Sequence, residues 1–87
     1  MHRVLIPTTL RSYTRQAVWV QAAGPTLCEL LLDLDRQFPG LRFRMVDEQD
    51  ELRPHMRVFV AGRPVKRLSF ALAPDVEVAI VQALSGG

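Results

Sequence analysis

Few residues in this 87-residue chain have the types and spacing that catalysis needs. Cys28 is the one cysteine, and His2 and His55 are the two histidines that could serve as its base. Cysteine catalysis requires a base within hydrogen-bonding reach of the thiol, and nothing in the sequence brings either histidine to Cys28. We therefore expect Cys28 to fill a small space in the core and both histidines to lie on the surface.

The acidic residues are also weak candidates for chemistry. The segment DEQDE at 47–51 lacks the Asp/Asn and Gly pattern of a calcium loop, so we expect a solvated loop there. Asp33 and Asp35 are two residues apart and would not face each other on a helix. The sequence contains no glycine-rich phosphate loop and no Cys-x-x-Cys pair. We predict no metal site, no cofactor bound by the chain, and no enzymatic activity of its own.

One feature remains, the ending QALSGG, in which strand-like residues run almost to Gly86 and Gly87. Glycine lacks a Cβ, so its backbone can enter a narrow channel and adopt φ values that other residues avoid. A terminal carboxyl group carried this way could react with ATP without steric hindrance. The alternative is an ordinary disordered tail.

Composition and charge place the chain among folded proteins. The hydrophobic fraction is 48%, and the length suits one domain. The basic residues, ten arginines and one lysine, are spread along the sequence, whereas nucleic-acid-binding proteins usually gather them on one face. We expect a solvated arginine-rich surface, with weak attraction to an acidic partner as the alternative. No signal peptide and no apolar stretch of about 18 residues is present, so we predict a soluble cytoplasmic protein without membrane or nucleic-acid partners.

The elements that must position the chain end can be read from periodicity. Short apolar segments at 2–7 and 17–21 predict a hairpin around the polar loop 8–16. The segment 41–55 is predicted to be a short strand and then a solvated loop. Further strands are predicted at 56–65, with a turn at 61–62, and at 76–84.

The clearest helix lies within 23–40. Thr26 and Glu29 have the spacing of a capping box, in which each side chain satisfies a free amide of the first turn. Pro39 and Gly40 end the helix. One apolar stripe is predicted to face the core, formed by Leu27, Leu30, Leu31, Leu34 and Phe38.

The order hairpin, helix, strand, short connection, strand predicts an α+β fold. It suits a β-grasp (ubiquitin-like) fold, a mixed sheet packed on one main helix with its two end strands adjacent. We expect one domain over 1–84 and a flexible tail over 85–87. Chain order alone does not determine which strands are neighbours.

The ending APDVEVAIVQALSGG resembles that of the bacterial ubiquitin-like sulfur carrier proteins. That family includes the thiamine-biosynthesis carrier, the small subunit of molybdopterin synthase and the carriers for cysteine biosynthesis. RVFVAGRPV also resembles the third strand and turn of ubiquitin, and TLCELLLDLDRQFPGL followed by DELRPHMRVFVAG is similar to the longer carriers. The resemblance covers nearly the whole chain.

The resemblance implies a mechanism in which Gly87 is the reacting group. A separate enzyme related to ubiquitin-activating enzymes would use MgATP to adenylate the Gly87 carboxylate. A sulfur donor would then displace AMP, and the thiocarboxylate would supply sulfur to a downstream biosynthetic enzyme. Leu84, Ser85 and Gly86 would form the part of the tail that enters the partner's channel. Some family members also require a metalloprotease that removes residues after the diglycine.

Alternation along the strands predicts the faces of the sheet. Val58, Val60, Val78, Ile80, Val4 and Ile6 are expected to point inward. Leu5, Phe59 and Val81 are then expected to point outward and to form a patch for docking of partners. The match to ubiquitin places Phe59 and Val81 where its recognition patch lies. The alternative is that the loop 8–16 covers one of the three.

Departures from the family pattern bear on the pathway. Carriers often have Asn-Gly where this chain has Ala61 and Gly62, and VQALSGG lacks the prolines usual in the molybdopterin synthase subunit. The length and the segments FPGL and DELRPH favour a cysteine-type or other biosynthetic carrier. Two alternatives stay open: a molybdopterin synthase small subunit, and a ubiquitin-like protein modifier or interaction module.

Overall fold

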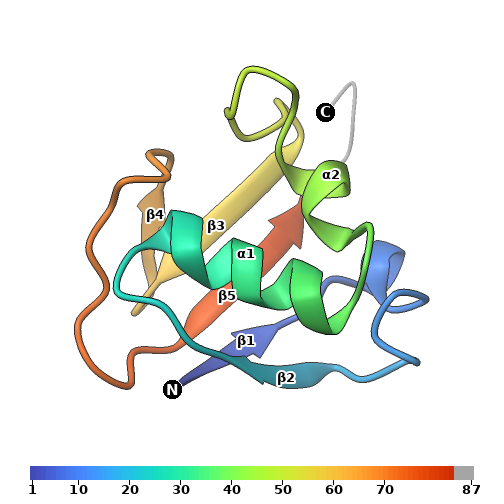
Figure 1. The fold of residues 1–87 in the computed structure, drawn as a ribbon, viewed down its shortest axis with the longest axis horizontal. Helices are drawn as coiled ribbons and strands as arrows, with labels where there is room; N and C mark the ends of the chain where they lie inside the picture. The colour runs from blue at the N-terminus through green and yellow to red at the C-terminus, as the bar shows by residue number, and fades with distance from the viewer. Residues whose placement is uncertain (84–87) are drawn as a thin grey trace.

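The computed structural model describes residues 1–83 (Figure 1). It contains a five-stranded mixed sheet with its main helix on one face. The strand order is β2-β1-β5-β3-β4. The strands are β1 (His2–Leu5), β2 (Trp19–Ala22), β3 (Met56–Val60), β4 (Arg63–Val65) and β5 (Val78–Gln82). The helices are α1 (Leu27–Gln37), α2 (Leu41–Met45) and a short 3₁₀ turn, η1 (Thr8–Leu10), within the first hairpin loop.

The two end strands pair in parallel at the centre of the sheet. Val4 is in register with Val78, and Leu5 with Ala79. The other neighbours are antiparallel: β1 with β2, β3 with β4, and β3 with β5. This is the β-grasp arrangement, so the predicted fold and the adjacency of the end strands are confirmed. The predicted boundary between 84 and 85 lies outside the described residues.

Side chains on one face of the sheet pack against α1, which crosses that face in Figure 1. The inward assignments are confirmed, because none of these side chains is more than 5% exposed: Val4, Ile6, Val58, Val60, Val78 and Ile80. The helix contributes four residues that are at most 1% exposed: Leu27, Leu30, Leu31 and Leu34. Phe38, the last residue of the predicted stripe, is only half-buried. The sheet and the helix therefore share one small apolar core.

The start of α1 is held by its own cap and by a distant loop. The Thr26 hydroxyl accepts the Glu29 amide at 3.3 Å, as the capping box predicts. The Glu29 carboxylate does not complete the predicted box, because it accepts the Thr26 hydroxyl at 3.0 Å. Two first-turn amides, of Leu27 and Cys28, donate to the carbonyls of Phe70 and Leu68. Amides left free at a helix start are thus satisfied by the connection that leads to β5.

The segment after α1 differs from the prediction: a short helix, α2, forms where we expected a strand. Leu41 and Met45 are buried, and their i, i+4 spacing fits one helix face as well as it fits alternation. Gly40 reverses the chain with φ 95°, a conformation that favours glycine. The Asp35 carboxylate accepts the amides of Gly40 and Arg42, both at 3.1 Å, and so supports the first turn. Capping by the Asp35 side chain therefore favours a helix over a strand at residues 41–45.

The backbone of β2 and of the residue after it forms hydrogen bonds with side chains of α1, on the side away from β1. The Ala23 amide donates to the Asp33 carboxylate at 2.9 Å, and the Gln37 amide group donates to the Gln21 carbonyl at 2.9 Å. Arg36 pairs with the same Asp33. These contacts lock the helix to the edge strand.

Gly24 offers a test of how closely β2 leads into α1. A Cβ at this position would lie 2.5 Å from the Leu30 amide nitrogen and 2.8 Å from the Glu29 carbonyl carbon. Because both are backbone atoms, we expect Gly24→Ala to lower the free energy of unfolding by about 1–3 kcal/mol in urea denaturation. Ala23→Ser, at the exposed neighbour, should change it by less than about 0.5 kcal/mol. Equal stabilities for the two variants would contradict the close approach.

Asp33 predicts a pH dependence of stability. The Ala23 amide, and then the Arg36 guanidinium, hold the pKa of this carboxyl below its usual value. A lowered folded-state pKa contributes stability above the unfolded pKa of about 3.9, and that contribution disappears as the pH falls through the folded value. We expect Asp33→Asn to cost about 1 kcal/mol at neutral pH. The cost should shrink in acid. Glu48→Gln, which changes an exposed carboxyl group, should cost less than about 0.5 kcal/mol at neutral pH. A cost for Asp33→Asn that did not vary with pH would overturn this account.

Candidate functional site

The outer face of the sheet, opposite the helices, carries an apolar row across all five strands. Strand register aligns Trp19 with Leu5, Leu5 with Ala79, Ala79 with Phe59, and Phe59 with Pro64. Paired residues point to the same side of a sheet. Val81, two residues beyond Ala79 on β5, shares this side. We call these six residues the outer band.

The structure places the three predicted patch residues together in the outer band. Val81 is 38% exposed, while Leu5 and Phe59 are half-buried by their neighbours. The loop after β1 does not cover Val81; it borders a hollow of about 290 Å³ whose lining includes Leu5, Val81 and Thr9. An interaction surface here would therefore combine an exposed apolar side chain with a shallow depression.

The sequence analysis missed the two ends of the outer band, Trp19 and Pro64. Trp19 is 38% exposed and Arg3 lies over its ring, with the guanidinium carbon 4.1 Å from the ring centre. Arg3 also lies 3.7 Å from the Glu77 carboxylate. In AVWVQ, alternation places Trp19 on the face of the sheet opposite to that of Val20. The outward direction of Trp19 could therefore have been predicted from the sequence.

The end of β5 is fixed to two surrounding loops. The Ala83 amide donates to the His55 carbonyl at 2.8 Å, and the Thr9 hydroxyl donates to the Gln82 side chain. The chain therefore leaves the sheet at a defined point beside the outer band. The predicted tail residues lie outside the described part of the chain: Leu84, Ser85, Gly86 and Gly87.

The candidate nucleophile and bases are not brought together. Our expectation for His2 was wrong: it is 5% exposed, and its ring nitrogens lie 3.0 Å from the Val76 carbonyl and 3.3 Å from the Gly24 carbonyl. His2 thus joins the start of β1 to the segments before β5 and α1. His55 is exposed, as expected, and Cys28 is half-buried rather than fully buried. No hydrogen bond links Cys28 to either histidine within residues 1–83.

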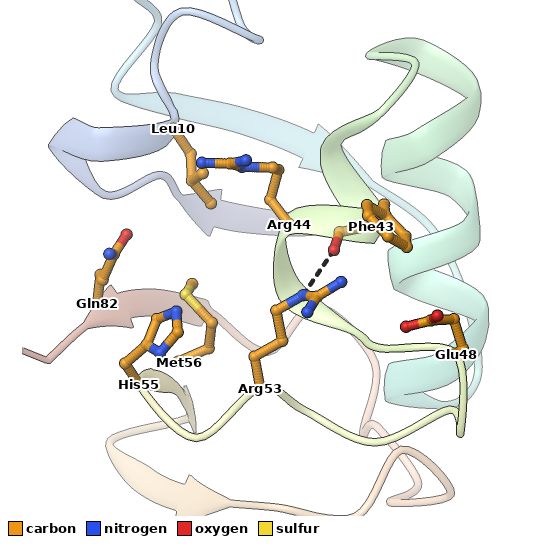
Figure 2. A pocket seen from close by; sticks show the side chains of 8 residues that line it. All are labelled: Leu10, Phe43, Arg44, Glu48, Arg53, His55, Met56 and Gln82. Atoms are coloured by element: carbon orange, nitrogen blue, oxygen red, sulfur yellow. Dashed lines mark hydrogen bonds between the residues drawn. The ribbon is translucent and has the colours of Figure 1, made fainter.

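A second hollow, of about 320 Å³, lies beside the end of β5 and was missed from the sequence (Figure 2). Arg44 comes from α2, Arg53 and His55 come from the loop before β3, and Gln82 closes one side. The cluster depends on α2, which the sequence analysis had assigned to a strand. We call this feature the basic hollow.

Two kinds of feature are absent from residues 1–83. No group of three His, Cys, Asp or Glu side chains is arranged to hold a metal ion there. None of the helices described is both long and apolar enough to cross a membrane.

Comparisons with known proteins agree with this architecture. The sulfur carrier protein CysO of Mycobacterium tuberculosis is 32% identical to this chain over 89 residues, which cover 97% of this chain and 96% of CysO. Its crystal structure superposes with a TM-score of 0.91 at 29% identity, covering 97% of this chain and all of CysO.

Two other solved structures are similar. The BexX/CysO complex of Amycolatopsis orientalis contains a chain with a TM-score of 0.92 and 29% identity, with both chains covered fully. The small archaeal modifier protein SAMP1 of Haloferax volcanii has a TM-score of 0.76 and 26% identity, covering 99% of this chain and 98% of that one. The sequence also matches the ThiS family over residues 4–87. The chain therefore belongs to the ThiS family of ubiquitin-like sulfur carriers, with CysO among its similar relatives.

Proposed function

We propose that this protein is a sulfur carrier whose C-terminal Gly87 is adenylated by a separate enzyme and converted to a thiocarboxylate. The observation that carries the proposal is the family match, which extends through residue 87, together with the near-complete alignment to CysO. CysO is named a sulfur carrier protein rather than an enzyme. In this proposal the catalytic groups belong to the partners, and this chain supplies the reacting carboxyl group.

The chemistry explains why a partner and MgATP are needed. A carboxylate is a poor electrophile because its negative charge repels a nucleophile. Attack of one Gly87 carboxylate oxygen on the α-phosphorus of ATP forms an acyl-adenylate and releases pyrophosphate. A sulfur nucleophile then attacks the acyl carbon, and AMP leaves with the bonding electron pair. With hydrosulfide as the nucleophile, loss of its proton leaves a thiocarboxylate on Gly87; with a persulfide, a thiol must then reduce the acyl disulfide that forms. The thiocarboxylate can attack the substrate of a downstream enzyme.

The described structure supports this role by the way it holds the last strand. β5 lies between β1 and β3, so neighbouring strands bond it on both sides. Its end is tied to His55 and Thr9 immediately before the predicted tail. A partner that binds the sheet would therefore find the end of β5 at a reproducible position, which lowers the entropy lost when the residues that follow are threaded.

The outer band is the surface that we assign to partner docking. Exposed apolar residues beside polar ones are typical of protein interfaces. The related CysO occurs in a complex with BexX, so a carrier of this fold does engage another protein. Leu5, Phe59 and Val81 would contact the adenylating enzyme while the tail enters its active site.

The alternatives receive less support. A molybdopterin synthase small subunit would use the same tail, but the chain lacks the expected prolines in VQALSGG. A protein modifier would form an amide between Gly87 and a lysine, and SAMP1 bears the name of a modifier, yet its identity and TM-score are lower than those of CysO. The carrier proposal therefore stands first.

The product predicts a mass change. After incubation with ATP, its adenylating enzyme and a sulfur source, the intact mass of the chain should rise by the difference between sulfur and oxygen. Deleting Gly87 should abolish this change, and so should adding one residue after Gly87, while both variants keep the wild-type circular dichroism spectrum. Persistent lack of the mass change with a competent enzyme would refute the proposal. Covalent adducts to lysine would favour the modifier instead.

The docking surface predicts a defect in binding rather than in folding. Val81→Ser should raise the KM of the adenylating enzyme for the carrier about tenfold, because an apolar contact is lost at the interface. The value of kcat and the free energy of unfolding should hardly change. Leu32→Ser removes a similarly exposed apolar side chain on α1, and should leave KM unaltered. Equal KM values for the two variants would show that docking does not use the outer band.

A further inference from the structure

The basic hollow beside the end of β5 is built from segments distant in the sequence. α2 supplies Arg44, the loop before β3 supplies Arg53 and His55, and β5 supplies Gln82. Figure 2 shows these side chains arranged around a common space, with Arg44 extending towards Leu10 and with Gln82 near His55. The hollow measures about 320 Å³, room for one or two side chains of another molecule.

The charges around the hollow are not balanced. Two guanidinium groups and one carboxylate, that of Glu48, line it. No carboxylate oxygen of residues 1–83 lies within 4.0 Å of either Arg44 or Arg53. Arg42, by contrast, pairs with Asp50 at 3.3 Å. The arginines of the hollow thus keep their capacity to bind an anion.

One of these arginines is already positioned. The Nε of Arg53 donates to the Phe43 carbonyl at 2.8 Å, and its guanidinium carbon lies 4.6 Å from the centre of the Phe43 ring. These contacts occupy one N–H and one face of the guanidinium, and the terminal N–H groups remain to bind a carboxylate. Because the Arg53 side chain is already held in place, less of its conformational entropy is lost when a ligand binds.

The lining also favours a protein segment over a small inorganic anion. Leu10, Phe43 and Met56 provide apolar walls next to the arginines. Gln82 borders both this hollow and the one beside Val81, so the two hollows adjoin at the end of β5. A polypeptide could place a carboxylate between the arginines and apolar side chains against the walls, whereas phosphate would use the charges alone.

We propose that the basic hollow binds a carboxylate-bearing, partly apolar segment of the protein that receives the tail. This inference rests on the proposed function for the identity of that protein. The chemistry of the site does not: it requires an acidic segment whether or not Gly87 is converted to a thiocarboxylate. Charge pairing at the point where the chain leaves the sheet would fix the direction in which the tail enters the partner.

The test is an NMR titration of the ¹⁵N-labelled full chain at low salt. The probe is a blocked peptide of alternating glutamate and leucine, and the matched control peptide carries glutamine in place of glutamate. We expect the glutamate peptide to shift the side-chain signals of Arg44 and Arg53 and the amide of Gln82, and the glutamine peptide to shift them much less. Arg44→Gln should weaken binding roughly fivefold. Arg63→Gln, an exposed arginine on β4, should leave binding unchanged.

Three outcomes would overturn the proposal. The first is equal shifts at all arginines, or equal affinities for Arg44→Gln and Arg63→Gln. The second is tighter binding of inorganic phosphate than of the peptide, which would indicate a phosphate site. The third is movement of the Arg44 and Arg53 signals on deletion of residues 84–87 without peptide, which would indicate that the chain's own end occupies the hollow.

A second measurement connects the hollow to the partner. With the adenylating enzyme, Arg44→Glu should raise KM about tenfold or more while kcat is unchanged, and Arg63→Glu should not. If the carrier is activated and both variants have the same KM, the proposal fails. If the wild-type chain is never activated, the proposed function fails, and the peptide titration still decides whether the hollow binds carboxylates.

Discussion

The parallel pairing of β1 with β5 is the constraint on which the rest of the structure depends. It joins Val4 to Val78 and Leu5 to Ala79, residues separated by almost the whole chain. Two antiparallel hairpins, β1–β2 and β3–β4, become one sheet only through β5. Closing so long a loop costs entropy, and burial of the strand side chains against α1 must offset that cost. The apolar row on the outer face is continuous only because this central pairing holds.

The two faces of the sheet differ in how deeply their side chains are buried. The inner face and α1 form a core in which most side chains are almost fully buried, while the outer face presents half-buried and exposed apolar residues. A domain of this size has little spare core to enclose an active site. It can nevertheless provide a rigid surface beside the end of β5, the last strand of the described residues. The proposed role needs only that, because the reactive carboxyl group would be carried on the chain and the catalysts would be supplied by others.

Period-two alternation was enough to predict which side chains of β3 and β5 point inward. Val58, Val60, Val78 and Ile80 alternate with outward residues because they pack against the apolar stripe of α1. Alternation was not enough for α2, because the spacing of Leu41 and Met45 fits both a helix face and a strand face. The helix is favoured by the Asp35 side chain, which caps its first turn. The burial of His2 depends on carbonyls at Gly24 and Val76, which only the folded topology brings near. The basic hollow escaped prediction for the same reason: its arginines are scattered in sequence and meet only after α2 and the following loop have formed.

The side chains along β2 have a consequence for solubility. An open sheet exposes unpaired N–H and C=O groups at both edges, and these can template pairing with another copy. Here Asp33 and Gln37 occupy polar groups at the β2 edge, and Pro64 removes an N–H from β4 at the opposite edge. A protein with an apolar outer face runs a risk of self-association, and these side chains make edge-to-edge growth of the sheet unfavourable. The domain can therefore expose an apolar face while its sheet remains limited to five strands.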